Sequence, residues 1–151
     1  MALSRKSAVF FLLPAAILFF AAALFFIASD PVAQEKSADG QSKLLVVWTS
    51  GDKEVAMKMV YMYTFNAKKQ GWFDEVRFLI WGPSVKLLIE DAELQEYLKK
   101  MHDAGVELQA CIACSNMYGA TDKLREFGVE VKGMGKPLTD MLKSGWTTLT
   151  F

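Results

Sequence analysis

Short apolar runs alternate with helix-like stretches through residues 44–151, and this alternation constrains the fold more than any other feature. Residues 44–48 (Leu-Leu-Val-Val-Trp) are apolar throughout, which is typical of a strand buried on both faces of a sheet. Further runs predict strands at residues 76–81, 106–111, 129–131 and 146–151. Because strands and helices alternate, we expect an α/β fold, namely a three-layer α/β/α domain around a mainly parallel five-stranded sheet.

The stretches between the apolar runs have helical periodicity. The clearest one places Leu94, Leu98 and Met101 on one face. Asp91 is its expected N-cap, and Gly105 is expected to end it. Further helices are expected at residues 53–69, 115–127 and 137–143.

A separate apolar segment precedes this domain. After Arg5 and Lys6, residues 8–28 contain no charged side chain. As a helix they would rise roughly 31 Å, close to the roughly 30 Å thickness of the hydrocarbon core of a membrane. We therefore expect a transmembrane signal anchor. A cleaved signal peptide is the alternative, although the nearest cleavage site, at residues 31–33, is imperfect.

The chain is therefore expected to have three parts: a leader (residues 1–29), a polar linker (30–43) and the folded domain (44–151). The basic residues before the apolar run keep the N-terminus in the cytoplasm, so the domain is expected on the extracytoplasmic (periplasmic) side. Cleavage of the leader would make the domain periplasmic or secreted.

Composition excludes several classes of protein. The 17 basic and 17 acidic residues cancel, so the chain has no basic footprint for nucleic acid. Two cysteines exclude a scaffold of several disulfides, and a single histidine, His102, excludes a multi-histidine metal site within one chain. We expect neither a metal nor a cofactor.

The loops that follow the predicted strands define the expected functional edge. In a parallel sheet the carboxyl ends of the strands share one edge, where open α/β folds bind ligands. Loops at residues 49–52, 82–84, 111–114 and 133–136 are expected there. Cys111 and Cys114 are the only thiols of the chain, and both lie in one of these loops.

A Cys-x-x-Cys pair between a strand and a helix favours thiol chemistry. The spacing places both sulfurs near the first helical turn, where the helix dipole favours thiolate. Lys136, in the loop after the neighbouring strand, is expected to add positive charge. The alternatives are buried structural cysteines, a structural disulfide, or half of a zinc or iron–sulfur site that only an oligomer would complete.

Three other residues are weaker candidates for the site. Ser50 is expected to cap the first helix or to hydrogen-bond a sulfur adduct. Trp81, at the end of a strand, and Tyr118, just after the cysteines, are expected near the thiols, where packing is the simpler role for both.

The predicted helix over residues 55–65 is apolar around more than half its circumference, which indicates either a deeply buried helix or a homo-oligomer interface.

Residues 43–151 resemble the DsrE/DsrF-like sulfur-relay family. The resemblance rests on the order of residues 48–51 (Trp-Thr-Ser-Gly), 80–82 (Ile-Trp-Gly) and 105–119, which contain the cysteine pair. It implies a three-layer α/β/α fold, trimers or hexamers, and a persulfide on the cysteine that follows the third strand, here Cys111. This chain departs from the family at Cys114, where sulfur-relay members often have alanine, and in its leader, because those members are normally cytoplasmic.

The resulting functional expectation is a persulfide carrier or sulfurtransferase. Cys111 is expected to hold sulfane sulfur, with Cys114 as resolving or relay thiol. The expected partners are a sulfur donor or acceptor protein or a small persulfide, other copies of the chain, and the membrane. The alternatives are an oligomeric binding module of an envelope complex, with structural thiols, and a thiol–disulfide oxidoreductase.

Overall fold

The computed structural model describes residues 40–151. The predicted leader (1–29) and most of the predicted linker (30–43) lie outside the described residues. Within residues 40–151, every helix is too short or too polar to cross a membrane.

A single five-stranded sheet, parallel throughout, forms the centre of the domain, in the order β4-β3-β2-β1-β5. Its strands are β1 (Lys43–Trp48), β2 (Glu75–Ile80), β3 (Glu107–Cys111), β4 (Glu130–Lys132) and β5 (Thr147–Thr150). The central strands β1 and β2 are paired along their full length, from Lys43 opposite Glu75 to Trp48 opposite Ile80. The expected α/β fold with five strands is confirmed.

Helices flank the sheet and connect its strands. They are α2 (Lys53–Val55), the π-helix η1 (Ala56–Tyr61), α3 (Met62–Lys69), α4 (Pro83–Glu90), α5 (Ala92–Asp103), α6 (Ile112–Met117), α7 (Thr121–Glu126) and α8 (Gly135–Lys143). Asp91 is the cap of α5 expected from the sequence, whereas α2 is capped by Asp52 and not by Ser50. The Asp52 carboxylate accepts from the N–H groups at the start of α2, and that of Asp91 accepts from the N–H of Leu94 in α5.

Two expectations about helices are wrong. The single helix expected at residues 115–127 is two helices, because Gly119 takes a φ of 60° between α6 and α7, a left-handed conformation that ends the first of them. Helix α4 was not expected; it starts at Pro83, a residue suited to the first turn of a helix.

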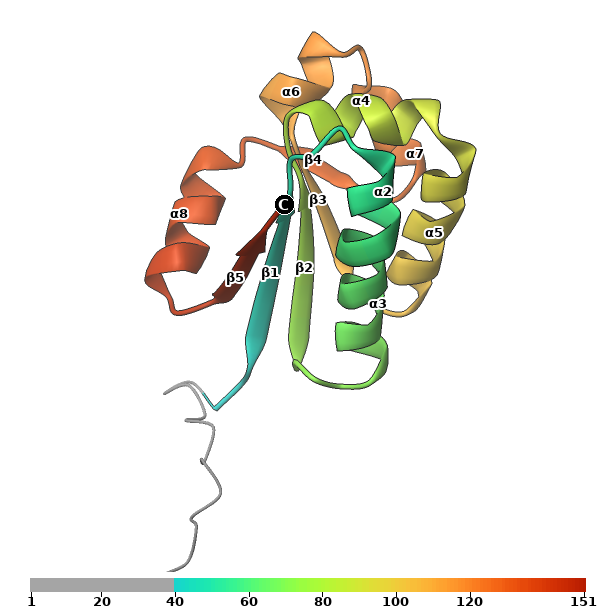
Figure 1. Cartoon of the computed structure of the whole chain (residues 1–151). Helices are drawn as coiled ribbons and strands as arrows, with labels where there is room; N and C mark the ends of the chain where they lie inside the picture. The colour runs from blue at the N-terminus through green and yellow to red at the C-terminus, as the bar shows by residue number, and fades with distance from the viewer. Residues whose placement is uncertain (1–39) are drawn as a thin grey trace, which may run out of the picture. The chain divides into compact units, whose positions relative to one another are not determined.

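The alternation of side chains along β1 separates two apolar clusters. Leu44, Val46 and Trp48 belong to a large core, whereas Leu45 and Val47 belong to a smaller cluster on the opposite face. Figure 1 shows α3 and α5 on one side of the sheet and α8 on the other. We call the first the large-core face and the second the α8 face.

Candidate functional site

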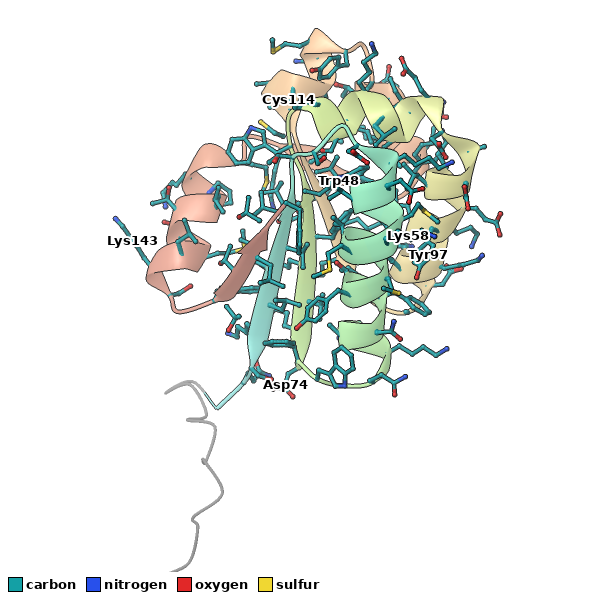
Figure 2. All side chains as sticks on the ribbon, viewed as in Figure 1. Trp48, Lys58, Asp74, Tyr97, Cys114 and Lys143 are labelled. Atoms are coloured by element: carbon teal, nitrogen blue, oxygen red, sulfur yellow. The ribbon has the colours of Figure 1, made fainter. Side chains whose placement is uncertain are left out.

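The two cysteines lie at the edge of the sheet where its parallel strands end. Cys111 is the last residue of β3, and Cys114 lies in the first turn of α6. The backbone of Gly82, which follows β2, hydrogen-bonds the Cys114 sulfur, so the loops after β2 and β3 meet here as expected. Figure 2 shows Cys114 at this end of the sheet and Asp74 at the other end.

Cys111 is buried on the α8 face. Only 6% of it is exposed, and it shares the smaller cluster with Leu79, Met134 and Met141. The Ser115 hydroxyl donates to the Cys111 carbonyl at 2.9 Å, which fixes the turn from β3 into α6. The Cys111 thiol is therefore held in an apolar environment at the start of a helix.

Cys114 is half-buried and hydrogen-bonded to Cys111, and both cysteines are free thiols. Burial raises the pKa of the Cys114 thiol above its ordinary value, and the neighbouring Cys111 raises it further, against the opposing effect of the Gly82 backbone. The expectation that the helix start favours thiolate is therefore wrong for Cys114, because the loss of hydration on burial outweighs the hydrogen bonds from the backbone that lower this pKa.

The structure separates the weaker site candidates. Trp81 packs against the smaller apolar cluster, as Cys114 does, so it lies near the thiols. Tyr118 ends α6 and is exposed, and Ser50 stabilises its own loop by accepting from the N–H of Asp52 at 3.1 Å. The Lys136 side chain is 84% exposed and bonded to Asp140 on the same helix, so it does not join the thiol pair.

A different lysine lies beside the site. Lys132 is the β4 residue paired with Cys111 in the sheet register. Its ammonium group bonds Glu130 at 2.7 Å, and Glu130 in turn accepts from Gln109 at 2.9 Å. The hydrogen bond from Lys132 is the main reason that the pKa of Glu130 is lowered. The sequence offers no signal that would choose Lys132 over Lys136, because the choice depends on strand register.

The helical segment over residues 55–65 is partly buried and partly exposed. Val60 and Tyr61 are buried in the large core, whereas Met59 and Met62 are 47% and 49% exposed. The segment contains the π-helix η1, which widens the helix where these side chains diverge. The interpretation of a buried helix therefore holds for the inner side of the segment, and the homo-oligomer interface stays a prediction for its outer side.

The arrangement of the two thiols suits thiol–disulfide and thiol–persulfide exchange. Two reduced thiols are hydrogen-bonded to each other, one buried and one closer to solvent. Within residues 40–151, His, Cys, Asp and Glu side chains form no group of three or more that would hold a metal ion. Because the two thiols are hydrogen-bonded to each other, a sulfur adduct on one thiol lies within reach of the other.

The sequence model of the DsrE/DsrF-like family matches residues 22–151. This chain belongs to the DsrE/DsrF-like family. The match covers the whole described domain, including both cysteines, and it confirms the resemblance seen in the sequence. No curated relative matches the chain.

Two solved structures are similar to this DsrE/DsrF-like domain. One is a conserved protein of unknown function, BT1422 from Bacteroides thetaiotaomicron, with 34% identity and a TM-score of 0.71 over 73% of this chain and 95% of that one. The other is the ychN protein from E. coli, with 17% identity and a TM-score of 0.60 over 73% of this chain and 99% of that one. The second similarity shows the fold alone.

Proposed function

We propose that this protein carries sulfane sulfur as a persulfide on Cys111, with Cys114 as the resolving or relay thiol. The observation that carries the proposal is the hydrogen-bonded pair of free thiols at the end of β3, in a domain of the DsrE/DsrF-like family. Sulfur relay is commonly linked to this family.

Loading transfers one sulfur atom between thiols. The Cys111 sulfur attacks the outer sulfur of a donor persulfide, the donor S–S bond breaks, and the donor leaves as a thiol. Cys111 then carries the S–SH group, and its proton has passed to the leaving thiolate. Its burial in the apolar cluster shields this group from water and from unrelated thiols.

Cys114 controls how long the persulfide lasts. A thiolate is required for attack, and the raised pKa of Cys114 keeps this thiol protonated near neutral pH. We therefore expect Cys111 to hold its sulfur until Cys114 is deprotonated or an acceptor arrives.

Attack by Cys114 has two balanced outcomes. Attack on the inner sulfur forms the Cys111–Cys114 disulfide and releases the outer sulfur as sulfide, after which a dithiol reductant must restore the pair. Attack on the outer sulfur moves it to Cys114 and returns Cys111 to the thiol, with no sulfide released. The first outcome makes Cys114 a resolving thiol, and the second makes it a relay.

We also propose that other copies of the chain cover the exposed side of residues 55–65. Met59 and Met62 are large apolar side chains on this outer surface. Attachment to the membrane through residues 8–28, with the domain on the periplasmic side, remains part of the proposal. Light scattering of wild type and Met59→Lys tests the interface, and cell fractionation tests the attachment.

Intact mass measurement tests the carrier function. The reduced full-length chain is treated with inorganic polysulfide, excess donor is removed, and Cys111→Ser and Cys114→Ser are treated alongside. We expect Cys114→Ser to gain about 32 Da, the mass of one sulfur atom, and Cys111→Ser to gain nothing. Equal adducts on both variants, or none on either, would refute the proposal. A disulfide formed without any adduct on Cys114→Ser would indicate a thiol–disulfide oxidoreductase instead.

A further inference from the structure

Sulfur-containing side chains from two distant segments belong to one apolar cluster at the end of β3. Cys111 and Met134 lie in the same buried cluster on the α8 face, and Cys114 packs against it. The sheet topology explains why Met134 shares a cluster with Cys111. Lys132 pairs with Cys111 in the sheet, and Met134 follows two residues later at the start of α8. Met134 is fully buried.

A second methionine of the cluster is already engaged. The Met141 sulfur accepts a hydrogen bond from an Arg77 nitrogen at 3.6 Å, and the Arg77 guanidinium lies 4.6 Å from the centre of the Trp146 ring. This leaves Met134 as the thioether that is available to the thiol pair.

Two thiols and a thioether are a donor set for a soft cation. Soft thiolate and thioether ligands favour Cu(I), zinc and iron–sulfur clusters, and of these Cu(I) is stably bound by only two or three sulfur ligands. Zinc requires four ligands, and the described residues bring together no set of three His, Cys, Asp or Glu side chains to supply them. The apolar surroundings add no competing oxygen ligand from the cluster itself.

We propose that Cys111, Cys114 and Met134 form a binding site for one Cu(I) ion when the two cysteines are reduced. Each thiol loses its proton to solvent as a copper–sulfur bond forms, and the thioether binds as a neutral ligand. Copper stays monovalent, so the step needs neither oxidant nor reductant. The hydrogen bond that now joins the thiols is replaced by the shared metal ion.

This site is independent of the sulfur-carrier function, although it uses the same thiols. A persulfide on Cys111 or a disulfide between the cysteines removes the ligands, so copper and sulfane sulfur compete for one place. Copper binding is measured without a sulfur donor, and sulfur loading is measured without copper. Failure of one proposal therefore leaves the other intact.

The test is a competition for Cu(I) under anaerobic, reducing conditions. The full-length chain is titrated with Cu(I) in the presence of a coloured bathocuproine chelator. We expect one Cu(I) per chain, and a loss of affinity of about 100-fold or more in Cys111→Ser and in Cys114→Ser. Retained affinity in either serine variant, or Zn(II) binding as tight as Cu(I) binding, would overturn the site.

The methionine has its own matched control. Met134→Leu conserves volume and removes the sulfur, and we expect about tenfold weaker Cu(I) binding. Met117→Leu makes the same change at a residue of α6 that is 83% exposed, and its affinity should equal that of wild type. Equal affinity in the two variants would overturn the assignment of Met134. Thermal unfolding followed by circular dichroism verifies that each variant is folded, and Cys111→Ala replaces a serine variant that is not.

Discussion

The two faces of the sheet differ in how densely they are packed and in which side chains they carry. On the large-core face, the rings of Trp48, Tyr61 and Phe78 pack with centres 5.2–5.9 Å apart, and the residues around them are almost fully buried. The α8 face has a smaller cluster that contains Cys111 and two methionines, beside the ion pairs of Arg77. Cys114 is partly buried and packs against both clusters. One face supplies most of the apolar burial, and the other holds the reactive groups where solvent is close.

Substitutions can test whether one face mainly stabilises the domain while the other carries the thiol chemistry. Most of the buried apolar side chains belong to the cluster of the large-core face, so the stability of the domain is expected to depend mainly on that face. Changes on the large-core face should therefore act on folding, and changes on the α8 face should act on sulfur chemistry.

The largest effect is expected on the large-core face. Phe78→Ala removes a fully buried ring that contacts Trp48 and Tyr61, and it should lower the free energy of unfolding by about 3–5 kcal/mol. Urea unfolding measures this loss. Where the variant remains folded, its Cys114 alkylation rate should match that of wild type, and a large change in that rate would show that the faces are not separable.

The next largest effect is expected in the rate of sulfide release, which should depend on pH. Because burial raises the pKa of Cys114, the thiolate fraction at neutral pH is small and grows as pH rises. Release of sulfide from a loaded chain should accelerate with pH by up to about tenfold per unit while the pH is below that pKa. Stopped-flow detection of sulfide measures the rate, with Cys114→Ser as a variant that should release none. A rate that falls with rising pH would contradict the role given to Cys114.

A milder effect is expected when a methionine of the α8 face is exchanged. Met141→Leu keeps the volume of the cluster and should cost less than about 1.5 kcal/mol of stability, although it removes the acceptor for Arg77. Urea unfolding beside Phe78→Ala provides the comparison. Equal losses in the two variants would show that the small cluster stabilises the domain as much as the large core does.

The smallest effect is expected at a buried hydroxyl. The Tyr61 hydroxyl has no hydrogen-bond partner within residues 40–151, so Tyr61→Phe should leave stability unchanged or raise it by up to about 1 kcal/mol. Ser84→Ala is the matched control. Its hydroxyl donates to the Trp48 carbonyl at 2.6 Å, and its loss should cost about 1–3 kcal/mol. A larger loss for Tyr61→Phe than for Ser84→Ala would contradict this assignment of partners.

The large-core face was the more predictable of the two. Continuous apolar runs such as residues 44–48 indicate strands without any knowledge of their partners, and the spacing of Leu94, Leu98 and Met101 indicates the buried side of α5. The break at Gly119 was missed, because a glycine between two helical stretches does not itself reveal a left-handed turn.

The α8 face was predictable only in part. The strand-to-helix position of Cys111 and Cys114 followed from the local sequence. The raised pKa of Cys114 and the nearness of Lys132 did not, because both depend on segments that only the folded sheet brings together. Local sequence predicts where the thiols lie, and tertiary packing determines their chemistry.

The most direct test of the central claim follows one turnover of sulfur on the two thiols. One equivalent of a small organic persulfide is mixed with the reduced chain, and sulfide, released thiol and protein mass are measured together. We predict that Cys114→Ser stops at the Cys111 persulfide. Wild type should go on to one of two end states: a disulfide about 2 Da lighter than the reduced chain with one sulfide released, which makes Cys114 a resolving thiol, or a persulfide on Cys114 with no sulfide released, which makes it a relay. Persulfide formation in Cys111→Ser, or no persulfide in Cys114→Ser, would contradict the assignment of Cys111 as the carrier.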